Sequence, residues 1–280
     1  MHAIAAIDIA LWDIKGRGFG LPFWRLLGGA RDKCPVYATF GFGFYRAEEL
    51  AEAATKWQAK GFNSLKMTVG NQALARRDEP RLLGDVILED ANRVETVRMA
   101  AGPEAELFID ANCSLDLYHA RQLCQMIEPF HIEFFEEPIT QNDIRHMAEL
   151  RSQTTIRLAC GQNEGQAYRF RDMMIAGAVD IIQPNVAITG GFTQCQKIAA
   201  LANSFNISVD NGGAWPFFNQ HLQAGLSNGG LVEYHYSSVE VCKQLYIGLP
   251  EPKEGWLKMT NTPGLGFELN IAALSHFEID

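Results

Sequence analysis

Short apolar segments typical of β-strands alternate along this chain with amphipathic helical segments, and the unit repeats at roughly 25-residue steps. Eight segments predict strands, at residues 36–40, 62–69, 106–110, 131–136, 156–161, 179–183, 207–210 and 231–233. Helical periodicity marks residues 2–15, 47–60, 115–127, 141–151, 167–176, 192–203 and 219–226. Strands that alternate with helices indicate a parallel sheet of the α/β class. Eight strands favour a closed TIM-type (β/α) barrel, although periodicity alone does not exclude an open, doubly wound sheet.

The segments divide the chain into three parts. Residues 1–30 predict a helix that leads into the barrel, residues 31–248 the barrel itself, and residues 249–280 a C-terminal return segment. The return segment has no helical periodicity, because Pro250, Pro252 and Pro263 interrupt it.

Composition excludes several classes of function. The formal net charge of −9 and the absence of a long basic run argue against nucleic acid and anionic membranes as partners. The six cysteines are far apart, with no Cys-x-x-Cys pair, which indicates reduced thiols and a cytoplasmic protein. No apolar run reaches the roughly 20 residues that a membrane span needs.

Polar residues stand at or near the end of most predicted strands. They are Lys66, Asp110, Glu136, Gln162, Asn185, Asp210 and Glu233. In a barrel these ends meet at one mouth, where the active sites of this architecture lie. Burying so many polar groups is costly unless they bind something, and their oxygens are ligands that Mg²⁺ prefers.

Several separated phrases carry a resemblance to a known family. They are residues 5–13, Leu26-Leu27-Gly28-Gly29, residues 108–112, Phe135-Glu136-Glu137-Pro138, residues 180–184 and Thr189-Gly190-Gly191. In this order they resemble the mandelate racemase and muconate lactonising group of the enolase superfamily. The resemblance implies a modified (β/α)7β barrel. Its C-terminal extension would pack on an α+β capping domain, which we expect this chain to lack.

The resemblance also implies a metal site. Relatives hold Mg²⁺ at the ends of the third, fourth and fifth strands, where it chelates a substrate carboxylate and stabilises an enediolate. Asp110 and Glu136 match the first two ligands. The third is usually Glu but is Gln162 here, which keeps an oxygen ligand and loses a negative charge. Glu164 is an alternative third ligand.

The acid and base positions depart from the family pattern. Lys66 matches the first lysine of a Lys-x-Lys motif, whereas the second is Thr68, on the same face of the strand. Asn185 stands where many relatives have the Asp of a His/Asp dyad, and no histidine lies near Asp210 or Asn211.

The resemblance assigns the remaining polar residues as follows. Glu233 matches a glutamate that donates a hydrogen bond to the substrate carboxylate. His235 is a substitute acid or base because its ordinary pKa lies near neutrality. Lys66, Asp210, Glu233 and His235 are therefore the catalytic candidates. Thr68, Asn112, Asn185 and Asn211 are candidates for binding substrate.

Each catalytic candidate has a structural alternative. Lys66 could be only an ion-pair partner of a barrel carboxylate. Asp210 begins an Asp-Asn-Gly-Gly run that also predicts a turn. His235 could be a packed or helix-capping histidine.

Three functions follow from these residues. The first is a Mg²⁺-dependent lyase that dehydrates a sugar acid or related hydroxy carboxylate. The second is a racemase, epimerase or cycloisomerase, which is less favoured because racemisation needs two opposed acid/bases and no clear pair is present. The third is a degenerate homologue that binds an anion or partner without turnover. The resemblance also implies a homo-oligomer.

Overall fold

The computed structural model describes residues 1–70 and 82–274, which form two compact units. The first unit comprises residues 37–161 and 170–182. The second comprises residues 1–36 and 162–169 and the chain from residue 183 onward. Within the described residues, no helix is both long enough and apolar enough to cross a membrane.

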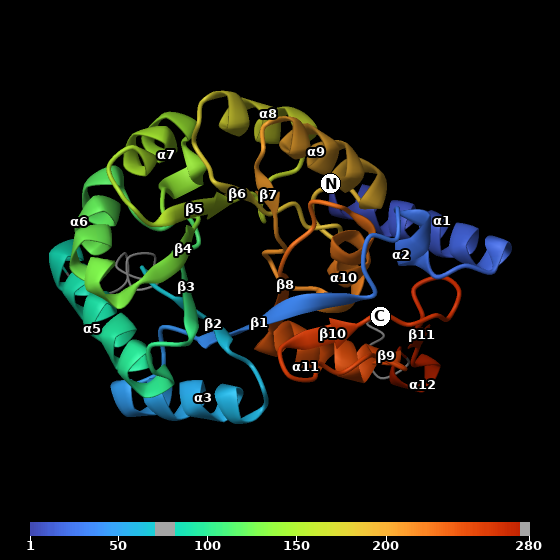
Figure 1. The fold of residues 1–280 in the computed structure, drawn as a ribbon, viewed down its shortest axis with the longest axis horizontal. Coiled ribbons are helices and arrows are strands. Elements are labelled where there is room, and N and C mark those ends of the chain that lie inside the picture. The colour runs from blue at the N-terminus through green and yellow to red at the C-terminus, as the bar shows by residue number, and fades with distance from the viewer. Residues whose placement is uncertain (71–81, 275–280) are drawn as a thin grey trace. The chain divides into compact units, whose positions relative to one another are not determined.

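Parallel strands build the first unit. They are β1 (Lys33–Gly41), of which residues 33–36 belong to the second unit, β2 (Ser64–Thr68), β3 (Glu106–Asp110), β4 (Ile132–Glu136), β5 (Arg157–Cys160) and β6 (Ile181–Ile182). Each pairs in parallel with the next. The connections contain α3 (Ala47–Ala59), α5 (Leu83–Ala101), α6 (Leu117–Ile127), η1 (Glu128–Phe130), η2 (Thr140–Asn142), α7 (Ile144–Arg151) and α8 (Ala167–Ile175). Figure 1 shows the helices α3, α5, α6 and α7 on the outer side of the curved row of strands. The predicted alternation of parallel strands and helices is confirmed for this unit.

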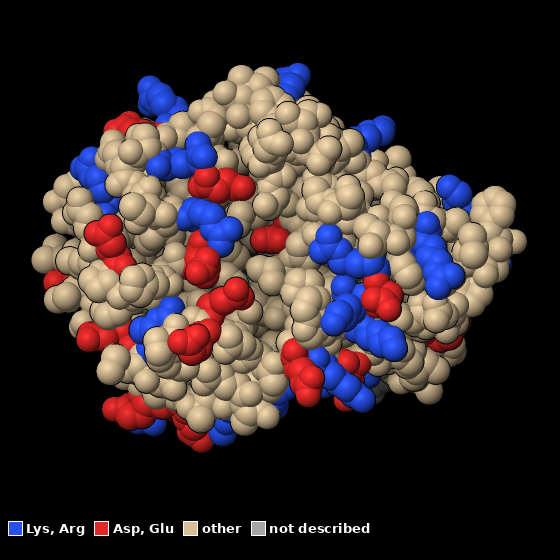
Figure 2. All heavy atoms as spheres, viewed as in Figure 1, with Lys and Arg blue, Asp and Glu red and all other residues tan. Residues whose placement is uncertain are grey.

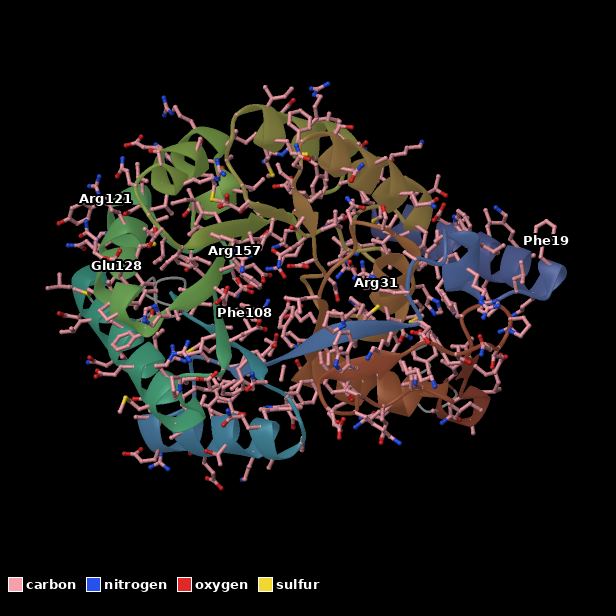
Figure 3. All side chains as sticks on the ribbon, viewed as in Figure 1. Phe19, Arg31, Phe108, Arg121, Glu128 and Arg157 are labelled. Atoms are coloured by element: carbon pink, nitrogen blue, oxygen red, sulfur yellow. The ribbon has the colours of Figure 1, made fainter. Side chains whose placement is uncertain are left out.

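The core of the first unit lies where the strands are buried on both faces. Phe108 of β3 stacks on Phe134 of β4 with ring centroids 4.3 Å apart, and Tyr37 of β1 meets Phe108 edge-on at 5.3 Å. In Figure 3 Phe108 lies among the strands, whereas Arg121 and Glu128 lie in the helical layer. Aromatic pairs of this kind add to the stability from apolar burial.

Aspartate caps fix two helix starts that the sequence predicted slightly too early. The Asp116 carboxylate accepts a hydrogen bond from the backbone N–H of His119, so α6 begins at Leu117 rather than at residue 115. Asp143 accepts from the N–H of His146 in the same way, so α7 begins at Ile144. A side-chain acceptor at this position satisfies a free helical N–H and sets the first residue of the helix.

The longest helix of the first unit, α5, fills a region where the sequence analysis named no helix. Its 19 residues bury an apolar stripe that includes Val86, Val94 and Val97. Asp90 and Arg93 are buried on the same side. Charges within the buried stripe weaken the apolar periodicity on which helix prediction depends.

The second unit contains the remaining elements. They are α1 (His2–Phe19), α2 (Phe23–Leu26), α9 (Phe192–Ser204), β7 (Ser208–Val209), α10 (Pro216–Gly225), β8 (Val232–His235), α11 (Tyr236–Leu245), β9 (Tyr246–Ile247), β10 (Trp256–Lys258), β11 (Glu268–Leu269) and α12 (Ile271–Leu274). Helix α10 begins three residues before the predicted start at 219, because Pro216 suits the first turn, where its missing N–H costs nothing.

Polar residues of the phrase at 5–13 anchor α1 within the second unit. The Asp8 carboxylate accepts from the N–H of Thr193 at the start of α9, and the Trp12 indole donates to the Thr193 hydroxyl. Asp13 accepts from the N–H of Leu265 in the C-terminal segment. This part of the family resemblance therefore reflects structural anchoring.

The C-terminal segment returns to the start of β1. Strand β10 pairs antiparallel with Lys33–Pro35, and the Lys33 ammonium lies 4.2 Å from the centroid of the Trp256 ring. Strand β11 pairs antiparallel with β9. Short strands therefore replace helices in a segment that contains three prolines and no helical periodicity before α12.

Surface charges of both signs are interspersed. Figure 2 shows Lys and Arg beside Asp and Glu on the face drawn. Arg157, labelled in Figure 3 at the start of β5, pairs with Glu133 of β4 at 2.8 Å.

His221 is a fully buried imidazole in α10. Its Nε2 donates to the carbonyl of Leu265 at 3.0 Å, which identifies the neutral ring with the proton on Nε2. Burial lowers the pKa of His221 from 6.5 to about 4, because the charged ring cannot be solvated there. The native state therefore binds this proton less readily than the unfolded chain does.

We expect the free energy of unfolding to fall as pH drops from 6.5 toward 4, by up to roughly 3 kcal/mol from His221 alone. His221→Gln keeps an N–H donor for the Leu265 carbonyl and removes the titration. Urea unfolding of both proteins at pH 7 and pH 4 measures the difference. An equal acid loss in the two proteins would contradict the assignment.

Candidate functional site

A buried ion-pair cluster joins three of the predicted site residues in the first unit. Lys66 Nζ lies 2.6 Å from Glu136 Oε2 and 3.4 Å from Asp110 Oδ2. All three side chains are buried, and Nζ also lies 5.2 Å from the centroid of the Tyr37 ring. The ion-pair alternative for Lys66 is thus observed, and it is compatible with a catalytic role.

Strand register brings the two carboxylates together. Thr68 of β2 is the register partner of Asp110 of β3, which is in turn the partner of Glu136 of β4. Side chains at the same level of neighbouring parallel strands lie beside one another on the sheet. Two carboxylates in this position are a suitable donor set for a hard divalent cation, with Lys66 as the counterion in the metal-free protein.

The Thr68 side chain hydrogen-bonds to the backbone of the neighbouring strand. Its hydroxyl donates to the carbonyl of Gly41 at 3.0 Å, and its own carbonyl accepts from Arg93. A threonine hydroxyl bonded in this way braces the strand end. It does not replace the amine of the second lysine in the family motif.

Backbone strain gathers immediately after the two carboxylates. Asn112, Cys113 and Glu137 have φ values of 47°, 58° and 41°, which non-glycine residues rarely adopt. Contacts support the strained turns: Glu137 is fully buried and accepts from the Asn142 amide at 3.0 Å and from the Cys113 thiol at 3.4 Å. Such strain concentrates at functional sites, which makes Asn112 a reasonable candidate for contact with substrate.

Asn185 in the second unit holds a loop in place. Its amide nitrogen donates to the carbonyls of Gly212, Gly213 and Ala214 at 2.7, 2.9 and 3.2 Å. Its amide oxygen accepts from the N–H of Ala187 and from the Asn219 amide. An aspartate could not donate these bonds, so the Asn at this position suits loop support better than proton transfer.

Asn211 and Glu233 bind the same segment. The Glu233 carboxylate accepts from the N–H of Ala214 at 2.6 Å, and the N–H of Glu233 donates to the Asn211 amide oxygen at 3.1 Å. Asp210 accepts from the N–H of Leu231 at 2.8 Å, just before β8. This bond favours a structural role for one oxygen of Asp210, in line with the turn that the sequence also predicted.

Gln162 packs beside Asn185 under Gly213. A Cβ added at Gly213 would lie 3.1 Å from the Gln162 Cβ, 3.3 Å from its amide oxygen and 3.2 Å from the Asn185 amide nitrogen. Glu164, the alternative third ligand, is instead bonded by both Nε and Nη2 of Arg169, at 2.9 and 3.2 Å. That pair would have to separate before Glu164 could bind a cation, so Gln162 is the better candidate.

His235 ends β8 and is the residue just before α11. Its Nδ1 lies 3.1 Å from the Ser237 hydroxyl. The His235 side chain makes no capping hydrogen bond at the start of α11, which argues against the helix-capping alternative. A role as acid or base remains a prediction.

Sequence reasoning missed the buried pair Asp90 and Arg93 of α5. Arg93 bonds the end of β2, which carries Lys66 and Thr68, and the end of β1, and its Nη1 lies 2.7 Å from Asp90 Oδ1. A detectable signal was present, because Asp90 lies four residues from both Val86 and Val94 on the apolar stripe. A charged residue on such a stripe needs a buried partner.

Comparison with known proteins identifies the family. Residues 49–273 match the family described as "Enolase C-terminal domain-like". Residues 1–28 match "Mandelate racemase / muconate lactonizing enzyme, N-terminal domain". The chain belongs to the enolase superfamily. Within it, this chain belongs to the mandelate racemase and muconate lactonising group, which confirms the resemblance read from the sequence.

Relatives of this enolase-superfamily chain include enzymes that are named after a sugar acid. It is 35% identical over 210 residues to the D-galactonate dehydratase of Klebsiella pneumoniae (strain 342), covering 75% of this chain and 53% of that protein. The chain thus spans about half the length of the curated relatives it matches.

Solved structures support the same fold. The 3,6-anhydro-D-galactonate cycloisomerase from Zobellia galactanivorans matches with a TM-score of 0.88 at 33% identity, over 100% of this chain and 76% of that one. A racemase from Streptomyces coelicolor A3(2) with bound magnesium matches with a TM-score of 0.88 at 27% identity, over 99% and 72%. The predicted α/β class, with the TIM-type barrel of the enolase C-terminal domain, is therefore confirmed.

Lys66→Met is expected to lower the free energy of unfolding by about 3–5 kcal/mol in metal-free solution, because it leaves two buried carboxylates without their cation. The matched control is Lys56→Met, since Lys56 pairs with Glu52 at 2.6 Å on the surface. Exposed pairs contribute at most about 1 kcal/mol. Denaturant unfolding in the presence of a chelator measures both, and similar small losses would contradict the account of the cluster.

Gly213→Ala is expected to destabilise the protein by about 1–3 kcal/mol, because φ at Gly213 is +73° and the new methyl group would press on Gln162 and Asn185. Gly84→Ala is the control, since a Cβ at Gly84 in α5 meets nothing within 4 Å. Alanine there should be neutral or stabilising by up to about 1 kcal/mol. Melting temperatures that fall equally in both variants would contradict this prediction.

Proposed function

We propose that this protein is a Mg²⁺-dependent dehydratase that acts on a sugar acid or related hydroxy carboxylate. The observation that carries the proposal is the buried cluster of Lys66 with Asp110 and Glu136. It combines two oxygen ligands with an amine that can exchange a proton. The names of the D-galactonate dehydratase relatives supply the reaction class.

Asp110 and Glu136 would hold the metal, with the amide oxygen of Gln162 as the proposed third ligand. When bound, Mg²⁺ would act as a Lewis acid toward the substrate carboxylate. The Lys66 ammonium now partly neutralises the two carboxylates. Engagement of these oxygens by a cation would end that pairing and free the amine for chemistry.

Lys66 is the proposed base. Its Nζ, in the amine form, takes the proton from the carbon next to the carboxylate, and the C–H electron pair passes into an enediolate of the substrate. The hydroxyl on the next carbon then leaves with one proton as water. The remaining enol becomes a 2-keto acid, so no oxidant or reductant is needed.

The acid that protonates the departing hydroxyl is proposed to be His235. Its Nδ1 lies 3.1 Å from the exchangeable hydroxyl of Ser237. Asp210 stays a second candidate, although one of its oxygens is bonded to the backbone N–H of Leu231.

Amide and carboxyl groups are proposed to orient the substrate. Glu233, in its protonated form, would donate a hydrogen bond to the substrate carboxylate, and Thr68, Asn112, Asn185 and Asn211 would line the site. Asn185 and Thr68 would act through the loop and strand end that they hold, because their observed bonds are to backbone carbonyls. A homo-oligomer in the cytoplasm, with no nucleic acid or membrane partner, remains the prediction from the sequence.

A cycloisomerase is the second candidate. The likeness to the 3,6-anhydro-D-galactonate cycloisomerase structure favours it. Racemisation is less favoured, because Thr68 and Asn185 supply no acid/base at two positions that relatives use. The bonds of Thr68 and Asn185 to backbone carbonyls support the third hypothesis, a homologue without turnover.

In D₂O with Mg²⁺, we expect the protein to exchange the α-proton of at least one sugar acid or to form a 2-keto acid. Chelation of the metal should abolish either signal, and Asp110→Asn should lower it at least about 100-fold, because it removes a ligand charge. Proton NMR over a panel of sugar acids measures exchange, and a carbonyl assay detects the keto acid.

Asp116→Asn is the matched control, because Asp116 is an exposed residue that caps α6 and contacts the His119 ring, and asparagine caps equally well. It should leave exchange unchanged. Exchange without keto-acid formation would favour the isomerase candidate. No exchange on any acid, together with no Mg²⁺ binding by calorimetry, would contradict the enzyme proposal and favour the homologue without turnover.

A further inference from the structure

Helix α5 buries a complete ion pair beside the strands that carry the proposed base. Asp90 and Arg93 are 2% and 7% exposed, and Arg93 Nη1 lies 2.7 Å from Asp90 Oδ1. Burial of two charges is costly unless each finds further hydrogen bonds. The bonds that these two residues make therefore indicate what they hold.

The pair binds four backbone groups at the ends of β1 and β2. Arg93 Nη1 donates to the Thr68 carbonyl at 3.0 Å, and Nη2 donates to the carbonyls of Gly41 and Phe42 at 3.1 and 2.9 Å. Asp90 Oδ2 accepts from the N–H of Gly70 at 2.6 Å. The two side chains thus form a clamp, which we call the α5 clamp, across the ends of both strands.

The α5 clamp acts where the strand ladder is irregular. Register between β1 and β2 shifts after Thr39, which is opposite Lys66, so that Gly41 rather than residue 40 is opposite Met67. A shift of this kind leaves backbone groups without their ladder partners. Arg93 and the Thr68 hydroxyl supply donors to the Gly41 carbonyl at that point.

Lys66 is two residues before the clamped carbonyl of Thr68. Its ammonium must reach two carboxylates on two further strands, and a shift of about 1 Å at the strand end is enough to disturb catalytic geometry. Guanidinium suits this task because its planar fork donates in several fixed directions, whereas a lysine ammonium is a single compact charge.

We propose that Asp90 and Arg93 are positioning residues that fix the end of β2 and thereby hold the Lys66 amine toward Asp110 and Glu136. The inference rests on the proposed function for its catalytic consequence, but the coupling between Arg93 and Lys66 is testable without activity. A purely structural clamp would stabilise the unit independently of Lys66.

The test is a double-mutant cycle of Arg93→Lys with Lys66→Met, read first by denaturant unfolding of the purified protein. If Arg93 positions Lys66, the effect of Arg93→Lys on the unfolding equilibrium constant should be at least tenfold smaller in the Lys66→Met background than in the wild-type background. The reason is that Lys66→Met removes the amine that Arg93 would position. Glu136→Gln, which removes the nearer partner of Lys66, is the second background if Lys66→Met does not fold.

Arg98→Lys is the matched control on the same helix. Arg98 lies nearer the C-terminal end of α5. It also donates to backbone carbonyls, those of Phe130, Gly102, Ala105 and His131. Its effect on unfolding should be the same in both backgrounds within about twofold. If Arg93→Lys changes the unfolding equilibrium constant equally in the wild-type and Lys66→Met backgrounds, the positioning role is overturned.

Turnover provides the second measurement. Arg93→Lys and Asp90→Asn should each lower kcat for α-proton exchange about tenfold or more with KM changed less than about twofold, whereas Arg98→Lys should leave kcat unchanged. Equal losses of kcat in Arg93→Lys and Arg98→Lys would overturn the inference. Absence of exchange in the wild-type protein would instead count against the proposed function and leave the unfolding cycle to decide the positioning role.

Discussion

The buried contact of Lys66 with Glu136 and Asp110 is the interaction on which the candidate site depends. Neither carboxylate would remain charged at low cost in the interior of the first unit without a cation nearby. Lysine supplies that cation, and its 2.6 Å contact to Glu136 is short enough for a charge-assisted hydrogen bond. The same cluster is a suitable donor set for a divalent cation, so structural and chemical roles coincide in three side chains.

Parallel pairing makes this cluster possible, and side chains of α5 bond the backbone beside it. Thr68, Asp110 and Glu136 stand at one level across three strands because β2, β3 and β4 are in register at their ends. Beside them the pairing of β1 with β2 is irregular, and side chains of α5 bond the carbonyl groups there. A helix on the outer side of the sheet therefore bonds the strand ends beside the ion-pair cluster.

Asn185 and Gln162 of the second unit are amides at positions where the family resemblance implies acidic residues. Asn185 donates to three carbonyls of one loop, which an ionised aspartate could not do. Gln162 packs next to it under Gly213, a position that accepts no side chain without strain. These contacts explain why Asn and Gln are accommodated where relatives carry acids, and they support loop positioning as the main role of Asn185.

The sequence by itself determined the fold class, the family and the identity of the strand-end residues, because strand periodicity and motif order are local properties of the chain. It could not determine that Lys66 meets both carboxylates, since that contact depends on the register of three strands. The sequence also did not predict the α5 clamp. Asp90 and Arg93 interrupt the apolar stripe of α5, and their partners are backbone groups distant in sequence. Only tertiary structure decided which polar residues join the buried ion-pair cluster and which, like Thr68 and Asn185, bond the backbone, since the same side chain can do either according to the groups around it.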